Sequence, residues 1–240
     1  MRLSKLLDIV VDLLYPRRCP VCRDIVSKGK FICTECVDKL NYVQPPYCSK
    51  CGKHIDSEDA EYCDDCKKEV RRYRKGFPVF EYHGAIKESV MAFKYKNKRE
   101  YAAFYAEEIM KKHGEALEQV GADALIPVPV HKKKRRMRGY NQAEVLANAL
   151  AARLNIPCYN DTLVRVENTK VQKQLDHNQR KKNLKSAFKR VQDGVKLKTV
   201  ILVDDIYTSG ATIEACTEVL LATGVEEVYY VSVCIGKGQS

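Results

Sequence analysis

Runs of apolar residues bounded by polar or turn-forming residues recur along the chain and predict the strands of a buried sheet. The clearest run is at residues 199–203, where four aliphatic side chains follow one another without a polar interruption. An unbroken run of this kind indicates a strand that is covered on both faces, as in parallel sheets. The same pattern predicts strands at residues 77–82, 124–128, 156–166, 199–203 and 225–235.

Helical patterns separate most of these strands. They predict helices at residues 4–15, 85–96, 100–113, 142–154 and 212–222. The first of these helices is amphipathic and ends at Pro16. Alternation of strands and helices predicts an α/β fold with a parallel sheet. A chain of 240 residues is long enough for one such domain and a smaller module.

Eight of the eleven cysteines form four Cys-x-x-Cys pairs near the N-terminus. Each pair presents two thiolates to one ion, and two pairs fill the four tetrahedral positions of Zn²⁺. We therefore predict two closed zinc sites, which are structural because no coordination position is left open for a substrate. The ligands are Cys19, Cys22, Cys33, Cys36, Cys48, Cys51, Cys63 and Cys66.

The sequence leaves the pairing of these cysteines open. Sequential sharing assigns the first four to one ion and the last four to another, whereas interleaved sharing gives a cross-brace. Sequential sharing is favoured because its shorter loops cost less entropy to close. An iron–sulfur cluster is the first alternative to zinc, and the regular, ribbon-like spacing favours zinc. The remaining cysteines lie in apolar contexts and are predicted core residues: Cys158, Cys216 and Cys234.

The net charge of +11 is concentrated in residues 131–190, which contain sixteen Lys or Arg and four Asp or Glu. Such an excess predicts an anionic partner. The best apolar run, at residues 6–14, is interrupted by Asp8 and Asp12 and is far shorter than the ~20 residues of a membrane-spanning helix. We therefore expect a cytoplasmic protein without a membrane span, whose cysteines bind metal rather than form disulfides.

Two acids, Asp204 and Asp205, follow the strand at residues 199–203, and a hydroxyl-rich loop leads from them into the next helix. Loop N–H groups, hydroxyls and the positive end of a helix are the groups that bind phosphate. Neighbouring carboxylates suit the vicinal hydroxyls of a sugar, so this segment predicts a site for a ribose 5-phosphate. The loop consists of Tyr207, Thr208, Ser209, Gly210, Ala211 and Thr212.

Three further segments are strongly basic or polar. Residues 131–142 follow a predicted strand, where doubly wound sheets place ligand-binding loops, and favour anion binding. Residues 167–183 have little apolar periodicity and predict a polar lid over the site. Residues 67–75 carry six basic side chains and are interpreted as a solvated linker, with a contact to nucleic acid or phosphate as the alternative.

The cysteine pairs are followed by four motifs: Arg138-Gly139-Tyr140-Asn141-Gln142, Thr169-x-x-Gln172, Arg180-x-x-Asn183 and VDDIYTSGAT. Together these features resemble the ComF/ComFC competence proteins, a GntX-like branch of the phosphoribosyltransferases. The resemblance implies a type I phosphoribosyltransferase fold over residues 76–240, with helices on both faces of a parallel sheet. It also implies that residues 1–75 form an N-terminal helix, a double zinc ribbon and a basic linker.

The same resemblance implies that phosphoribosyl pyrophosphate (PRPP) binds together with Mg²⁺. Asp204 and Asp205 would hold the ribose hydroxyls, and residues 207–212 would wrap the 5-phosphate. Basic and polar groups from three other segments would contact the pyrophosphate. These are His131, Arg138, Gly139, Asn141, Gln142, Lys94, Lys96, Gln172 and Arg180.

Two functions are compatible with this site. The family resembled is associated with natural transformation, so the implied partners are single-stranded DNA and the proteins of competence DNA uptake. The alternative is an active phosphoribosyltransferase that acts on an unidentified amine or nucleobase. In that reaction pyrophosphate leaves C1 of PRPP, and Asp204, Asp205 and Arg138 would stabilise the developing charges. The sequence contains no base-recognition motif that names the acceptor.

Overall fold

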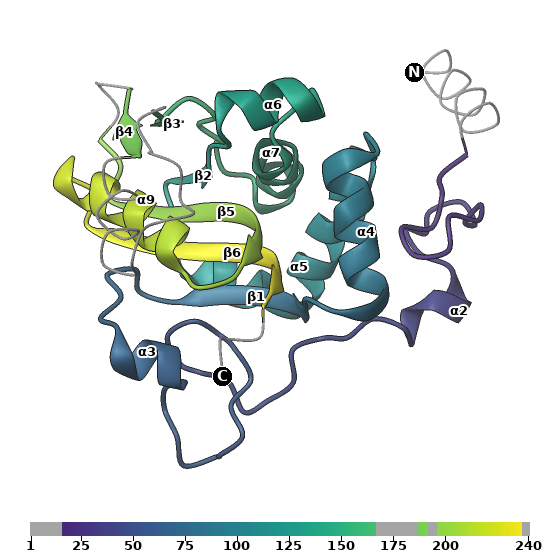
Figure 1. Ribbon diagram of the computed structural model, residues 1–240, viewed down its shortest axis with the longest axis horizontal. Coiled ribbons are helices and arrows are strands. Elements are labelled where there is room, and N and C mark those ends of the chain that lie inside the picture. Colours follow the sequence, from purple (N-terminus) through teal and green to yellow (C-terminus); the bar gives the residue numbers. More distant parts are fainter. Residues whose placement is uncertain (1–15, 167–186, 192–195, 237–240) are drawn as a thin grey trace, which may run out of the picture.

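The computed structural model describes residues 16–166, 187–191 and 196–236. At its centre is a four-stranded sheet in the order β1-β6-β5-β2, in which all neighbouring strands run parallel (Figure 1). The strands are β1 (Gly76–Glu81), β2 (Ala124–Pro127), β5 (Thr199–Tyr207) and β6 (Glu227–Ile235). The carboxyl ends of parallel strands lie along one edge of the sheet, which is where α/β proteins bind ligands.

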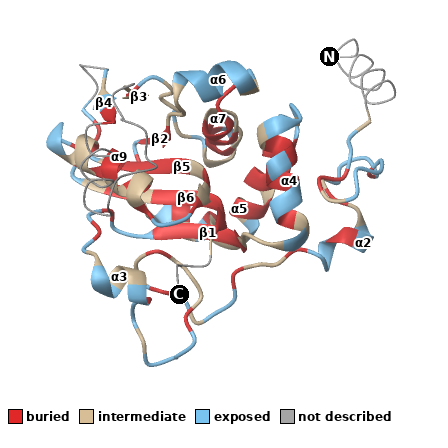
Figure 2. Cartoon of the chain, in the orientation of Figure 1, coloured by how far each residue is buried: buried red, intermediate tan, exposed pale blue. Residues whose placement is uncertain are grey.

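Helices cover both faces of this sheet. They are α4 (Gly84–Tyr95), α5 (Tyr101–Gln119), α7 (Gln142–Leu154) and α9 (Ala211–Ala222). In β5, Ile201 and Val203 join the core that contains side chains of α4, α5 and α7. Val200 and Leu202 join the core that contains side chains of α9. Successive strand side chains point to opposite faces, so the predicted α/β class with helices on both faces is confirmed, and Figure 2 shows its strands largely buried.

Only part of the predicted strand at residues 156–166 forms one. β3 (Leu163–Arg165) pairs antiparallel with β4 (Phe188–Arg190) in a separate two-stranded sheet. Upstream, Cys158 makes an isolated parallel bridge to Leu125 of β2. Pro157 and the turn at Asn160 interrupt the strand, because proline cannot donate to a sheet and asparagine favours turns.

The basic segment after β2 is a helix rather than the expected open loop. α6 (Lys132–Arg138) consists of lysine, arginine and methionine, which all favour helices. The His131 ring accepts a hydrogen bond from the Lys133 amide at 3.1 Å, and Gly139 ends the helix with a φ of 78°. The predicted helix at residues 4–15 and the predicted lid residues Gln172 and Arg180 lie outside the described residues.

The two cysteine-containing modules lie on opposite sides of the sheet. The first includes α2 (Thr34–Val37) and contributes to the core shared with α4 and α5. The second includes α3 (Asp64–Lys68) and contributes to the core shared with α9. In Figure 1 the first module lies beside α4, and the second lies next to β1. Among the described residues, no helix has both the length and the apolar character needed to cross a membrane.

Candidate functional site

The acid pair lies inside β5, not after it as the sequence suggested. The strand continues to Tyr207 because its pairing with β6 extends past the acids, through Asp204 opposite Ser232 and Ile206 opposite Cys234. Asp205 is buried and Asp204 is partly buried. The Asp205 amide donates to an Asp204 carboxylate oxygen at 2.8 Å. The two carboxyl groups also interact with each other at the carboxyl edge of the sheet.

Lys94, in the last turn of α4, supplies a positive charge to this pair. Its Nζ lies 3.1 Å from Oδ1 of Asp205, and both side chains are largely buried. Burial and the charge of Asp205 raise the pKa of Asp204, and Lys94 partly offsets that rise. Because perturbed carboxyl groups next to a cation are typical of functional sites, this cluster is the best candidate in the described chain for ligand chemistry. Lys96, two residues further along, is exposed.

The loop after β5 has the form that phosphate binding requires. Thr208 and Ser209 are exposed, and Gly210 adopts a left-handed φ of 76° before α9 begins at Ala211. The first amides of a helix have no intrahelical acceptor, so α9 presents free N–H groups and the positive end of its dipole here. Thr212, in the first turn of α9, is partly exposed. We call residues 208–210 the phosphate loop, after the role that the sequence predicts for them.

Tyr207 differs from the rest of the predicted loop, because its side chain is buried in the core. Its hydroxyl lies 2.9 Å from the hydroxyl of Tyr73, and its ring stacks on Tyr230 with the ring centres 4.7 Å apart. Its carbonyl accepts a hydrogen bond from the Gly236 amide at 2.7 Å. The Tyr207 side chain therefore packs against the phosphate loop from the core, with its hydroxyl oxygen next to Gly210.

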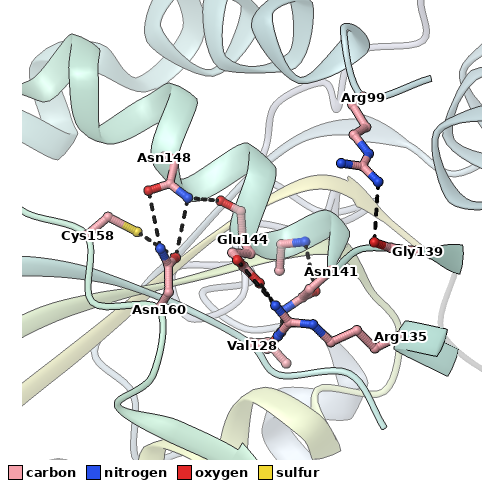
Figure 3. A network of polar contacts seen from close by, with 10 residues as sticks. Arg99, Val128, Arg135, Gly139, Asn141, Glu144, Asn148, Cys158 and Asn160 are labelled. Carbon is pink, nitrogen blue, oxygen red and sulfur yellow. Dashed lines mark hydrogen bonds and ion pairs between the residues drawn. The ribbon is translucent and has the colours of Figure 1, made fainter. Parts of the chain in front are cut away.

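The Arg138-to-Gln142 motif forms the connection between α6 and α7. Arg138 donates to Oε1 of Gln142 at 2.7 Å and to the hydroxyl of Tyr95 at 2.8 Å, and its guanidinium stacks on the Tyr95 ring at 4.7 Å. The Gly139 carbonyl accepts from Arg99 at 3.3 Å (Figure 3). These contacts hold a cluster of guanidinium groups near the end of α4, which also carries Lys94.

Asn141 has a structural role that its position in the sequence motif did not reveal. Its side chain donates to the Val128 carbonyl at 3.1 Å and accepts from the Ala143 amide at 3.1 Å (Figure 3). It thereby caps α7 and fixes the chain that leaves β2. Gln142 is also buried, so both side chains serve the shape of this turn.

Sequence analysis missed two residues that contact the phosphate loop or Tyr207 directly before it. Arg71 donates to the Ser209 carbonyl at 2.7 Å, and Tyr73 contacts Tyr207 as described above. The interpretation of residues 67–75 as a solvated linker is wrong for these two, since Arg71 is 7% exposed and Tyr73 is fully buried. The only available signal was the single aromatic residue in a charged run.

The eight paired cysteines form two clusters with sequential sharing, as predicted. In each cluster the four sulfur atoms lie within 4.8 Å of one another. The Sγ atoms of Cys22 and Cys33 are 3.6 Å apart, and those of Cys51 and Cys63 are also 3.6 Å apart. Tetrahedral zinc, with Zn–S bonds of about 2.3 Å, places its sulfur ligands about 3.8 Å apart. Both clusters therefore fit zinc.

Comparisons with known proteins agree with this architecture. Residues 10–67 match the double zinc ribbon domain family, and residues 141–240 match the phosphoribosyl transferase domain family. The chain is 30% identical to competence protein F of Haemophilus influenzae over 221 residues, which cover 88% of this chain and 93% of that protein.

Two other relatives cover similar shares of the chain. The DNA utilization protein YhgH of Salmonella typhi is 26% identical over 92% of this chain and 98% of its own length. Competence protein ComFC of Bacillus subtilis is 26% identical over 83% of this chain and 82% of its own length. These similarities extend across both the cysteine-containing modules and the α/β domain.

Proposed function

Because the chain belongs to the ComF/ComFC family of competence proteins, in which a double zinc ribbon precedes a phosphoribosyltransferase domain, we propose that it binds PRPP at the carboxyl edge of its sheet. One observation carries the proposal. Asp204, Asp205 and Lys94 meet at the end of β5, directly before a loop that opens α9. PRPP carries its hydroxyls and its 5-phosphate on one ribose, so these neighbouring groups match it.

Each part of the site has a distinct task in this proposal. The amides and hydroxyls of residues 208–212 donate hydrogen bonds to the 5-phosphate, and Asp204 and Asp205 accept hydrogen bonds from the ribose hydroxyls. Lys94 and Arg138 attract the pyrophosphate, and His131, Gly139 and the exposed Lys96 are the further contacts that we propose for it. Mg²⁺, which prefers oxygen ligands and phosphates, would arrive with PRPP and neutralise part of its charge.

Calorimetric titration with PRPP and Mg²⁺ tests the proposal. We expect binding by the native protein and a loss of at least about a hundredfold in affinity for Asp204→Asn/Asp205→Asn, because neutral amides replace the two carboxylates that accept hydrogen bonds from the ribose hydroxyls. Glu226→Gln/Glu227→Gln is the matched control. It removes the same charge at the opposite end of the sheet and should bind normally. Equal binding by both double variants would refute the proposed site.

The finer proposal of DNA handling rests on α6, which adjoins the PRPP site at Arg138. α6 presents exposed lysine and arginine side chains, and the exposed ring of Tyr95 is stacked with Arg138 beside it. Basic groups next to an accessible aromatic ring suit single-stranded DNA, which binds through phosphates and stacked bases. Anisotropy with a labelled oligothymidine should show binding that weakens steeply between about 50 and 200 mM salt. Lys132→Gln/Lys133→Gln/Lys134→Gln should reduce that slope, and an unchanged slope would exclude α6.

Turnover is the second candidate function, and the pKa of Asp204 favours it. A carboxyl group with a raised pKa can accept the proton that an amine loses as it attacks. In this reaction a bond forms between the acceptor nitrogen and C1 of PRPP, the bond from C1 to pyrophosphate breaks, and the proton passes to Asp204. A pyrophosphate-release assay over a panel of amines and nucleobases tests this step. Binding of PRPP without release for any acceptor would count against catalysis.

A further inference from the structure

We infer that the second cysteine cluster (Cys48, Cys51, Cys63 and Cys66) and the linker after it set the shape of the phosphate loop, with Arg71 as a positioning residue. This inference rests on the proposed binding of PRPP. The N-terminal module thereby shapes the PRPP site, although none of its zinc-binding cysteines belongs to that site. Three sets of contacts connect the cluster to the loop.

The first contact is made by the Arg71 guanidinium. Its Nη2 donates to the Ser209 carbonyl at 2.7 Å and lies 2.9 Å from Oε2 of Glu69. The side chain is buried, and these two partners offset part of the cost of removing its charge from water, which favours this position of the guanidinium. In a trans peptide the C=O and the following N–H point in opposite directions. By holding the Ser209 carbonyl on its own side, Arg71 directs the Gly210 N–H to the other side of the loop.

The second contact is a group of three buried tyrosines. Tyr73 and Tyr207 share a hydrogen bond, and both rings contact Tyr230, which stacks on Tyr207 and meets Tyr73 edge-on at 5.1 Å. Gly210 lies directly against this group. A Cβ atom added there would come within 2.2 Å of the Tyr207 hydroxyl oxygen. The tyrosines therefore form the surface on which the phosphate loop turns.

The third contact joins the tyrosines to the metal-binding turn. The Tyr230 hydroxyl donates to the Cys51 carbonyl at 2.8 Å, and the Gly76 amide donates to the Lys50 carbonyl at 2.9 Å. Gly76 also lies against the Tyr230 ring, which would meet an added Cβ atom at 2.2 Å. The turn at residues 48–52 is thus in direct contact with the support of the phosphate loop.

Arg71→Gln tests the inference, with ribose 5-phosphate and inorganic pyrophosphate as separate ligands in calorimetric titrations. Ribose 5-phosphate should bind about tenfold more weakly, since a hydrogen bond from a charged donor is lost. Pyrophosphate, which would occupy the other end of the site, should bind within about twofold of the native protein. The zinc content should stay unchanged, and Arg71→Lys should recover part of the affinity. Arg74→Gln is the control, because Arg74 lies in the same linker but pairs with Glu227.

Tyr73→Phe provides a second variant that keeps the ring and removes only the hydroxyl. It should weaken ribose 5-phosphate about threefold and leave pyrophosphate unaffected, so it decides the matter even if Arg71→Gln does not fold. If the native protein and the folded variants bind ribose 5-phosphate with equal affinity, the positioning role alone is overturned. Equal weakening of both ligands also overturns it, because that pattern indicates general damage. Absence of ribose 5-phosphate and PRPP binding by the native protein instead overturns the proposed function itself.

Discussion

The first cysteine cluster (Cys19, Cys22, Cys33 and Cys36) has an exposed ligand, Cys22, whereas the second has three buried ligands and one that is partly buried. Their spacing in the sequence is nearly the same, and both fit tetrahedral zinc. The two clusters differ in how deeply their ligands are buried and in which elements pack against them. Two zinc sites with equal ligands can therefore stabilise different parts of one protein.

The module that contains the first cluster lies beside α5. A polar surface hollow separates part of its module from that helix and is lined by Lys30, Phe31, Thr34, Glu107 and Lys111. The second cluster packs closely against β1, where the Gly76 amide donates to the Lys50 carbonyl at 2.9 Å. A Cβ atom added to Gly52 in its turn would come within 2.5 Å of Pro78 in β1. The second cluster is therefore continuous with the sheet that carries the ligand site.

Replacing one ligand in each cluster gives the largest expected difference between them. Cys51→Ser should remove the second zinc ion and lower PRPP affinity by more than about a hundredfold, because the turn that this ion stabilises contacts the tyrosines that support the phosphate loop. Cys22→Ser should remove or weaken only the first zinc ion and leave PRPP affinity within about threefold. Zinc analysis and calorimetry on the same samples measure both effects. Equal losses of PRPP binding would show that the clusters act as one unit.

The cysteine clusters and the central sheet were predictable because their signals are local. Two Cys-x-x-Cys pairs with a short loop define a site by themselves, and the aliphatic run of residues 199–203 defines a strand covered on both faces. The acid pair was also found, although β5 extends through it. Continued pairing with β6, a long-range contact, decides where that strand ends.

The support of the phosphate loop was not predictable, because it depends on contacts between distant residues. Arg71 and Ser209 are separated by 138 positions, and Tyr230 lies 179 positions from Cys51. A charged linker is more often solvated, and no short-range pattern distinguishes one buried arginine from its exposed neighbours. The same limit applies to Asn141, whose capping role requires the Val128 carbonyl as a partner.

A glycine exchange gives the next largest effect and tests the loop side of the comparison. Gly210→Ala should weaken PRPP about thirtyfold, because the new methyl group would overlap Tyr207 and the backbone would be strained at a φ of 76°. Gly224 has a φ of 95°, but an added Cβ atom would meet nothing within 4 Å. Gly224→Ala should therefore lower the stability of the protein and leave PRPP affinity unchanged. Calorimetry and thermal unfolding separate the two. Similar PRPP affinities in both variants would mean that the tyrosine support does not control the loop.

The smallest expected effect concerns the connection between the two clusters. Lys112 of α5 donates to the Val43 carbonyl at 2.5 Å and to the Val79 carbonyl at 3.2 Å, so it fastens the segment between the clusters to β1. Lys112→Met should lower the free energy of unfolding by about 1 kcal/mol and leave PRPP affinity unchanged. Denaturant unfolding and calorimetry measure these two quantities.

Burial lowers the pKa of Lys112 to about 8, which gives this comparison a pH dependence. Between that value and the ordinary lysine pKa of about 10.4, the unfolded chain binds more protons than the folded one. The native protein should therefore gain stability relative to Lys112→Met as the pH rises from about 8 to 10.4. A flat difference would contradict the burial of a charged amine at this point. A loss of PRPP affinity in Lys112→Met would instead show that the first module also reaches the ligand site, through the segment that Lys112 fastens.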